Sequence, residues 1–208
     1  ATKIFASKGA TVIMACRSMD KAHQAKQLIL SDQEDASLIP MIIDLASLAS
    51  IESFALEFKK QYTQLDVLLN NAGILSIPYS KTIDGLEMQN GVNHLGHFAL
   101  TAHLFDLLKK TKSSRIVNLS SLAHIQGKMD FDNFLFEKGK YKKMRSYARS
   151  KLSILLFTFE LDRRIKEKGY DVKVLAAHPG FSSTDLGRHM TGKHHRNLFE
   201  IYAKKIGQ

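Results

Sequence analysis

A tyrosine and a lysine four residues apart, Tyr147 and Lys151, suggest a specific chemistry for this sequence. Apolar residues follow at helical spacing, at Leu152, Leu155 and Phe159, and predict a long helix with one buried face. Residues four apart are neighbours on a helix, so the phenol and the ammonium point the same way. We expect the ammonium to lower the pKa of the tyrosine from its usual value near ~10, which would let the phenol exchange a proton with an alcohol or carbonyl oxygen. The same spacing also occurs on exposed helices without function, so the rest of the chain must support this interpretation.

The elements that would position this pair alternate along the chain between short apolar segments and amphipathic ones. The expected strands are residues 11–16, 37–43, 65–69, 115–119 and 172–177. The expected helices are residues 1–8, 18–30, one capped by Ser47 or Ser50, 84–110 with Asp84 as its cap, one through Tyr147 to about Lys168, and a weak one at 197–206. Residues 122–143 lack periodicity and are expected to form an irregular excursion. This alternation predicts an α/β fold with a doubly wound parallel sheet.

Polar or conformationally special residues follow each expected strand. In chain order they are Arg17, Asp44, the run Asn70-Asn71-Ala72-Gly73, the pair Ser120-Ser121, and Pro179-Gly180. The carboxyl ends of parallel strands meet at one edge of the sheet, and such sheets bind ligands in a crevice at that edge. We therefore expect these residues to line one crevice together with the tyrosine and the lysine.

Composition limits the class of protein. A length of 208 residues with 44% hydrophobic residues fits a single globular domain over residues 1–208. One cysteine, Cys16, rules out a disulfide within the chain and favours a reducing, cytoplasmic location. No apolar run approaches the ~18 residues of a membrane-spanning helix. The start of the chain has neither a signal-peptide block nor an initiator methionine, so we expect a piece of a longer protein.

The net charge of +10 raises the alternative of binding to nucleic acid or to an anionic membrane. Most of the cations are dispersed, and aromatic residues are not interleaved with them as stacking platforms. A basic surface without a macromolecular partner is therefore the favoured interpretation, and a basic lining that attracts a phosphorylated cofactor is a third.

Taken together, these residues resemble the short-chain dehydrogenase/reductase family. The matching motifs are Asn70-Asn71-Ala72-Gly73, Asn93, Ser121, Tyr147-x-x-x-Lys151 and Pro179-Gly180. The sequence around them is similar to the retinol-dehydrogenase-like branch at residues 15–17, 93–98, 116–124 and 178–180. The resemblance covers almost all of residues 1–190. It implies a Rossmann-type NAD(P)-binding fold and hydride transfer between an alcohol and a carbonyl.

The resemblance implies four catalytic residues. Tyr147 would be the general acid/base, and Lys151 would lower its pKa and hold the nicotinamide ribose hydroxyls. Ser121, rather than Ser120, would hydrogen-bond the substrate oxygen. Asn93 would hold a water that relays protons to Lys151.

The resemblance also implies a cofactor site. Its residues would be Arg17, Asp44, Leu45, Asn71, Ala72, Gly73, Tyr147, Lys151, Pro179, Gly180 and Thr184. Asp44 would accept from the adenine amino group or cap a helix, Gly73 would allow close approach of the adenosine ribose, and Thr184 would lie near the carboxamide. A guanidinium at Arg17 suits a ribose 2′-phosphate, so NADP is expected as the cofactor and NAD is the alternative. Arg17 could instead be an ordinary surface arginine. No metal is expected, because the histidine spacings match no closed zinc set.

Two features of the family are absent from the sequence. These are the Gly-x-x-x-Gly-x-Gly phosphate turn and the strand that precedes it, which lies at the centre of the order 3-2-1-4-5-6. We expect their absence to separate the first two strands from the other three and to remove a helix N-terminus from the pyrophosphate. We therefore expect these 208 residues alone neither to bind NADP tightly nor to turn over.

Alternative functions remain at this point. One is a catalytically silent cofactor-binding regulator or scaffold of the same fold, and others are a sugar-nucleotide epimerase and a nucleic-acid binder. The expected partner is a small alcohol or carbonyl compound, which the branch resemblance suggests is lipophilic. The long helices at 85–110 and 144–168 resemble those that pair between subunits in this family, which implies a homodimer or homotetramer.

Overall fold

The structure, a computed structural model, describes residues 1–180, so Thr184 and the helix expected at 197–206 lie outside the described residues. Five strands are present in this part: β1 (Val12–Cys16), β2 (Leu38–Ile42), β3 (Val67–Asn70), β4 (Ser114–Leu119) and β5 (Val172–Ala177). The α-helices are α1 (Thr2–Ala6), α2 (Met19–Leu30), α3 (Leu48–Gln61), α4 (Met88–Asn90), α5 (Gly96–Lys110) and α6 (Lys143–Lys168). A π-helical turn, η1 (Gly91–Leu95), joins α4 to α5, and two 3-10 turns, η2 (Leu122–Gln126) and η3 (Phe131–Asn133), lie between β4 and α6.

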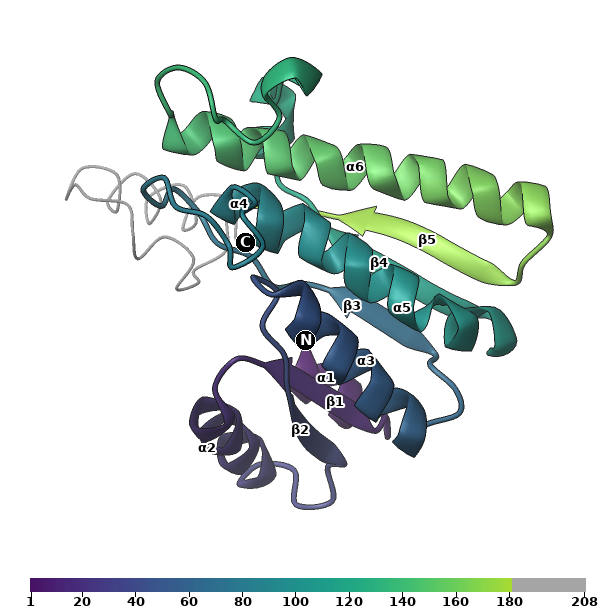
Figure 1. The fold of residues 1–208 in the computed structure, drawn as a ribbon. Coiled ribbons are helices and arrows are strands. Elements are labelled where there is room, and N and C mark those ends of the chain that lie inside the picture. The colour runs from purple at the N-terminus through teal and green to yellow at the C-terminus, as the bar shows by residue number, and fades with distance from the viewer. Residues whose placement is uncertain (181–208) are drawn as a thin grey trace.

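The strands are parallel and alternate with helices, which confirms the expected α/β class (Figure 1). In the described part of the chain they form two sheets, one of order β1-β2 and one of order β3-β4-β5. This division confirms the expected separation of the first two strands from the other three. Asn70 lies opposite Asn118, and Leu119 lies opposite Ala177, so the carboxyl ends of the second sheet share one edge.

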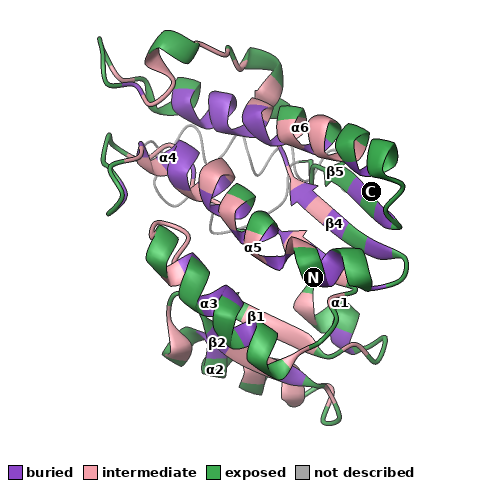
Figure 2. Cartoon of the chain, turned by 45° about the vertical axis from the view of Figure 1, so that its right-hand side comes forward, coloured by how far each residue is buried: buried purple, intermediate pink, exposed green. Residues whose placement is uncertain are grey.

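One hydrophobic core joins the two sheets. Helices α3 and α5 pack against each other, and the core between them includes Phe54, Phe58, Leu104 and Leu108. Figure 2 shows that the buried residues lie on the sides of helices and strands that face one another. The first strand was expected to be buried on both faces, and this was wrong, since four of its residues are half-buried and Ala15 is exposed. Among the described strands β1 pairs with β2 alone, which leaves its other edge uncovered.

Several helix ends lie at the capping residues that the sequence predicted. Ser18 and Ser47 are the N-caps of α2 and α3, accepting from backbone N–H groups at 3.4 and 3.2 Å. Helix α6 ends at Gly169, whose φ of 66° lies in the left-handed region that glycine adopts without strain. The expected cap at Asp84 was wrong. Asp84 accepts instead from the backbone N–H of Leu48 at 3.0 Å.

The helix of Asn93 begins later than expected and is interrupted. It starts at Met88, and its N-cap is Glu87, whose carboxylate accepts from the first backbone N–H groups. Residues 91–95 then form the π-turn before the regular α5 begins. No helix among residues 1–180 combines the length and the hydropathy that a membrane crossing requires.

Candidate active site

The tyrosine and the lysine share one side of α6, as their spacing indicates. The Nζ of Lys151 lies 5.7 Å from the ring centroid of Tyr147, and both residues are 5% exposed. The Ser121 side chain, at the start of η2, lies near enough to the phenol to lower its pKa. Ser120 has a different partner, because its buried hydroxyl donates to the carbonyl of Lys151 at 2.9 Å. Of the two serines, Ser121 is therefore the one beside the phenol.

The electrostatics of the pair differ from the expectation. Burial raises the pKa of Tyr147, and the nearby Ser121 side chain opposes that rise only in part. The expected lowering of the Tyr147 pKa by Lys151 is therefore wrong for this structure. Burial also lowers the pKa of Lys151 from 10.5 to about 8, because the ammonium loses its hydration. Desolvation, which no spacing rule contains, is the largest cause of both shifts.

Asn93 is fully buried within the π-turn, an irregularity that is frequent at functional sites. Its Oδ1 accepts from the N–H of Ile74 at 2.8 Å, and its Nδ2 donates to the Ile74 carbonyl and to the Ser150 hydroxyl, both at 3.0 Å. These bonds fix the loop after Gly73 to the turn and the turn to α6. The role of Asn93 in holding a water stays a prediction, and its carboxamide already has protein partners.

Two histidines near the π-turn are held neutral. His97 is buried, with its Nδ1 3.0 Å from the Asn93 carbonyl, and burial lowers its pKa to about 4. His94 stacks edge-on against Phe98 and Phe157, and burial lowers its pKa to about 4 as well. Within residues 1–180, no group of three or more His, Cys, Asp or Glu side chains could hold a metal ion.

The neighbourhood of Lys151 fits a nicotinamide ribose. A Cβ placed on Gly73 would lie 3.3 Å from the Asn93 Oδ1 and 3.7 Å from the Lys151 Nζ, so only the absence of a side chain leaves that approach open. Nζ carries three donors, and the Leu119 carbonyl takes one of them at 2.8 Å. No other acceptor for this ammonium occurs among the described residues. A buried cation with donors to spare suits a ribose diol.

The other expected cofactor residues lie along the carboxyl ends of the strands. Arg17 directly follows β1 and is exposed, and it has no ion pair within residues 1–180. Asp44 is half-buried, and one of its oxygens accepts from the Ala46 N–H at 2.9 Å, so it does not cap α3. The backbone of Leu45 lies close to Gly96. A Cβ added to Gly96 would be only 2.6 Å from the Leu45 carbonyl oxygen.

The remaining residues of that group follow the second sheet. Asn71 and Ala72 are exposed after β3, and Pro179 and Gly180 are exposed after β5. The Gly180 N–H donates to the His178 Nδ1 at 3.2 Å. The residues expected to bind the cofactor thus follow strands of two separate sheets, Thr184 lies outside the described residues, and their role in binding stays a prediction.

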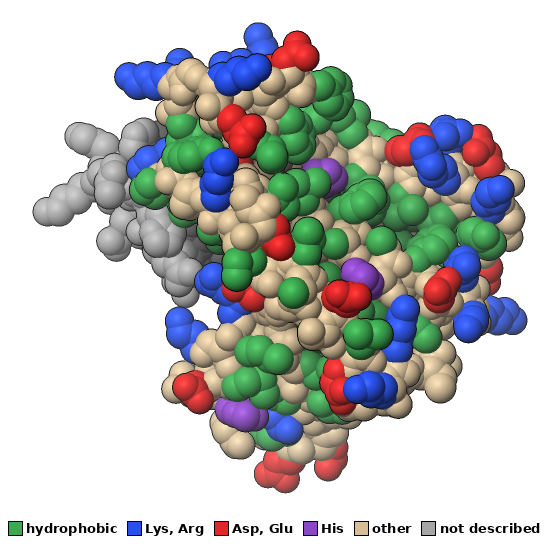
Figure 3. All heavy atoms as spheres, viewed as in Figure 1, with side chains coloured by type: hydrophobic (Ala, Val, Ile, Leu, Met, Phe, Trp, Pro, Cys, Tyr) green, Lys and Arg blue, Asp and Glu red, His purple; other side chains and the backbone are tan. Residues whose placement is uncertain are grey.

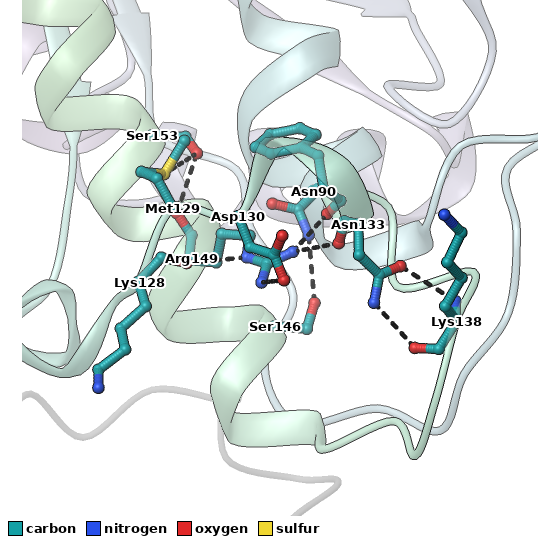
Figure 4. A network of polar contacts seen from close by, with 10 residues as sticks. Asn90, Lys128, Met129, Asp130, Asn133, Lys138, Ser146, Arg149 and Ser153 are labelled. Carbon is teal, nitrogen blue, oxygen red and sulfur yellow. Dashed lines mark hydrogen bonds and ion pairs between the residues drawn. The ribbon is translucent and has the colours of Figure 1, made fainter.

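Arg149, within the Tyr147-x-x-x-Lys151 motif, was not singled out from the sequence. It is 1% exposed and lies two residues from each member of the pair, on the opposite side of α6. Its guanidinium donates to the carbonyls of Lys128, Asn133 and Phe134 at 3.0, 2.6 and 2.9 Å (Figure 4). The excursion 122–143 therefore runs across the back of α6. No sequence signal distinguished this arginine from exposed ones, although the five-residue motif contains it.

A hollow of about 320 Å³ lies between Leu95 and residues 131–138 of the excursion. None of Ser121, Tyr147 and Lys151 lines it. The hollow is therefore separate from these three residues, of which Lys151 contacts Leu119 at the carboxyl end of β4.

The parallel strands, the covering helices and the polar carboxyl edge define a Rossmann-type α/β domain. The chain belongs to the short-chain dehydrogenase family, because residues 1–194 match the family described as short chain dehydrogenase. Retinol dehydrogenase 13 of Homo sapiens is 47% identical over 189 residues, which cover 91% of this chain and 56% of the relative. Retinol dehydrogenase 14 of Homo sapiens is 45% identical over 195 residues, covering 88% and 57%. The chain thus spans little more than half the length of these curated relatives.

Solved structures agree with this assignment. An uncharacterized protein from Mycobacterium Paratuberculosis has a TM-score of 0.78 and 39% identity, covering 90% of this chain and 65% of that one. The Pseudomonas aeruginosa RhlG/NADP active-site complex has a TM-score of 0.69 and 21% identity, covering 93% and 71%, and shares the fold. The family expected from the sequence motifs, and the likeness to retinol dehydrogenases, are confirmed.

Proposed function

We propose that the protein containing this chain is an NADP(H)-preferring oxidoreductase that interconverts an alcohol and a carbonyl compound. Residues 1–208 would form part of its NAD(P)-binding domain. The observation that carries the proposal is the meeting of Ser121, Tyr147 and Lys151 at the carboxyl edge of β4, from two separate segments of the chain. Family membership supports the same reaction class.

The proton would move at the Tyr147 hydroxyl. In the reducing direction the phenol donates its proton to the carbonyl oxygen, and in the oxidising direction the phenolate takes it from the alcohol. Ser121, which lies near the phenol, would donate to the same oxygen and stabilise its developing charge. Burial keeps the phenol protonated, which is the form that carbonyl reduction requires.

Lys151 would hold the ribose hydroxyls with the donors that the Leu119 carbonyl leaves over. A bound nicotinamide would supply or accept the hydride at the substrate carbon. Gly73 would leave room for the ribose, and the Asn93 carboxamide would hold the Gly73 loop in place through Ile74. Asn71, Ala72, Pro179 and Gly180 would line the same cofactor.

The preference for NADP rests on Arg17. Its guanidinium is exposed at the carboxyl end of β1, where a ribose 2′-phosphate could form a paired, charge-assisted contact. Asp44, at the end of β2, keeps one carboxylate oxygen for an adenine amino group, since the other accepts from Ala46.

We propose a lipophilic substrate. The two relatives reported above are named retinol dehydrogenases. In η2, which follows Ser121, the side chains of Leu122 and Ile125 are 43% and 74% exposed and provide an apolar surface. Such a surface favours an apolar substrate tail over a charged one.

We also propose that two copies pair through the outer faces of α5 and α6. Figure 3 shows hydrophobic side chains gathered over these helices, between charged groups at the margins. Phe98, Leu156 and Phe159 are 49%, 45% and 67% exposed there. Light scattering of the full-length protein, compared with a Phe159→Glu variant, tests this pairing.

Replacing Tyr147 by Phe in the full-length protein tests the proposed reaction. The variant should lose turnover of a lipophilic aldehyde with NADPH, while the affinity for NADPH stays within a few-fold, because only the acidic hydroxyl is removed. Stopped-flow absorbance measures turnover, and calorimetry measures cofactor binding. A wild-type protein that binds NADPH but reduces no aldehyde or ketone would favour a silent cofactor-binding regulator instead.

A further inference from the structure

Glu87 is a fully buried carboxylate that receives five hydrogen bonds. The donors are the Gln89 N–H at 3.0 Å, the Asn90 N–H at 2.9 Å, the Asn90 Nδ2 at 2.6 Å, the Tyr141 hydroxyl at 2.8 Å and the Ser146 hydroxyl at 2.8 Å. No ion pair to Glu87 occurs among residues 1–180. A carboxylate without a countercharge is tolerated at such a place only because neutral donors surround it.

The donors come from two parts of the chain that are distant in the sequence, one beside Glu87 itself and one more than 50 residues later. Gln89 and Asn90 belong to α4, Tyr141 to the end of the excursion, and Ser146 to the first turns of α6. The Gln89 side chain repeats the connection, since it accepts from the Ser76 N–H at 2.8 Å and donates to the Lys143 carbonyl at 2.9 Å. The loop after β3, the excursion and α6 are therefore tied together around this carboxylate.

Two serines of α6 receive the cross-links from the helix of Asn93. Ser146 donates to Glu87 and accepts from the Asn90 Nδ2 at 3.3 Å, a contact that Figure 4 marks. One helical turn later, Ser150 accepts from the Asn93 Nδ2 at 3.0 Å. Both serines are 0% exposed, and each directly precedes a member of the reactive pair, Tyr147 or Lys151.

The two cross-links determine where Tyr147 and Lys151 point. A rotation of α6 about its axis, or a slide along it, would carry the phenol away from Ser121 and would also break both serine contacts. Asn93 supplies the second link, and the Gln89 Nε2 also donates to the Tyr141 hydroxyl at 2.7 Å and to the first residue of α6, Lys143. Glu87 differs from Gln89 because it also accepts from Ser146, the residue directly before Tyr147. The carboxylate therefore ties the start of α4 to the turn of α6 that carries the tyrosine.

We propose that Glu87 is a positioning residue that fixes the rotation and register of α6 and so holds the Tyr147 hydroxyl beside Ser121. This role rests on the reaction proposed above. The choice of glutamate follows from the donors, because a carboxylate only accepts, whereas a carboxamide would turn an NH₂ group toward N–H and O–H donors.

The test is Glu87→Gln in the full-length protein, an isosteric change. Turnover should fall about 10- to 100-fold, because displacements of about 1 Å in a positioned group have effects of that size. The midpoint of the pH profile of kcat should shift, whereas KM and the NADPH dissociation constant should change less than threefold. Turnover per folded molecule and a pH profile both equal to the wild type would overturn the proposal.

Two further variants guard against a folding defect and a general effect of charge. Ser146→Ala removes only the donor that precedes Tyr147, and it should shift the pH profile in the same direction with a smaller loss of turnover. Glu160→Gln, on the exposed side of α6, removes a carboxylate that binds Arg163 and Arg164, and it should leave both quantities unchanged. An unshifted profile in Ser146→Ala, with Glu87→Gln unfolded, counts against the proposal.

A direct titration of Tyr147 separates this proposal from the proposed reaction. The difference in ultraviolet absorbance between each protein and its Tyr147→Phe counterpart reports the ionisation of this phenol without any turnover. A shifted midpoint in Glu87→Gln supports the positioning role even if no substrate reacts. An unshifted midpoint in an active enzyme overturns the positioning role and leaves the reaction intact.

Discussion

The Nζ of Lys151 donates a 2.8 Å hydrogen bond to the carbonyl of Leu119, the last residue of β4. A helix side chain thus crosses to the carboxyl end of the sheet and holds a charge where water is largely excluded. The cost of this arrangement appears in the pKa of Lys151, which burial lowers from 10.5 to about 8. The free energy of unfolding should therefore change with pH as Lys151 gains or loses its proton.

The first prediction concerns Lys151→Met. Because the folded pKa is lowered, the unfolded chain binds more protons between pH 8 and 10.5, so stability rises with pH across that window and the full penalty remains below it. At about 1.4 kcal/mol per pKa unit the penalty is on the order of 3 kcal/mol at pH 7. The stability difference between variant and wild type should therefore favour the variant more at pH 7 than at pH 10, as measured by urea unfolding.

Lys166→Met is the matched control, since Lys166 lies on the same helix with its side chain 75% exposed. Its stability difference from the wild type should be the same at both pH values. A difference for Lys151→Met that does not change between pH 7 and pH 10 would show that the ammonium is not desolvated in the folded protein.

The second prediction concerns Gly127, which sets the distance between η2 and α6. A Cβ there would lie 2.7 Å from the Ala148 carbonyl and 2.8 Å from the Leu152 Cβ, and backbone atoms cannot move aside cheaply. Gly127→Ala should therefore cost about 1–3 kcal/mol of unfolding free energy. It should also lower kcat, because the added methyl group would push η2 away from α6 and so move Ser121 away from Tyr147. Urea unfolding and steady-state kinetics measure the two effects.

The exposed neighbour Gln126 provides the comparison, and Gln126→Ala should leave stability and kcat near those of the wild type. Full stability of Gly127→Ala would mean that η2 approaches α6 less closely than the structure indicates. Loss of stability with unchanged kcat would separate the spacing of η2 from catalysis.

Signals that involve a few neighbouring residues were sufficient to predict much of the fold. Ser18 and Ser47 begin helices and Gly169 ends one, each through groups that are adjacent in the chain. The apolar runs predicted the positions of the strands. The division into two sheets was predicted from the family that the chain resembles, because that family's first strand lies at the centre of its sheet and is absent from this sequence. The helix ends could be predicted without that resemblance, because no distant contact is needed to produce them.

The features that escaped prediction all depend on contacts between distant segments or on burial. Glu87 replaced Asp84 as a cap because donors from residues 141 and 146 surround it. The sequence does not distinguish Arg149 from an exposed helix arginine, because its burial depends on the excursion, which packs over it. The pKa of Tyr147 rose because the tyrosine is desolvated, and the depth of burial is not readable from a four-residue spacing.

The third prediction tests the cofactor preference through Arg17→Glu. The change removes a cation from the end of β1 and supplies an acceptor suited to a ribose 2′-hydroxyl. If charge-assisted hydrogen bonds are worth about 1.5–3 kcal/mol, kcat/KM with NADPH should fall about 10- to 100-fold, and activity with NADH should hold or rise. Kinetics with both cofactors in the full-length protein measure the switch. Lys21→Glu, at an exposed site on α2, should leave the preference unchanged. An NADPH preference that survives Arg17→Glu would assign the 2′-phosphate to other residues.

The last prediction concerns the buried guanidinium of Arg149, which holds the excursion through three carbonyls and lies 3.9 Å from the ring centroid of Phe136. Arg149→Met removes every donor and should destabilise the protein by about 2–4 kcal/mol. Residues 128–138 should then be cleaved faster by a protease, because the contact of the Ser153 hydroxyl with the Met129 sulfur at 3.7 Å does not replace the three lost bonds to backbone carbonyls.

Arg149→Lys separates geometry from charge, since an ammonium cannot reach three carbonyls in the planar fork of a guanidinium. It should recover only part of the lost stability, and cleavage within residues 128–138 should stay faster than in the wild type. Arg145→Met, exposed on the same helix, should change neither quantity. Urea unfolding and mapping of the first proteolytic cut measure both effects. Wild-type stability in Arg149→Lys would mean that the positive charge, and not the fork of donors, holds the excursion against α6.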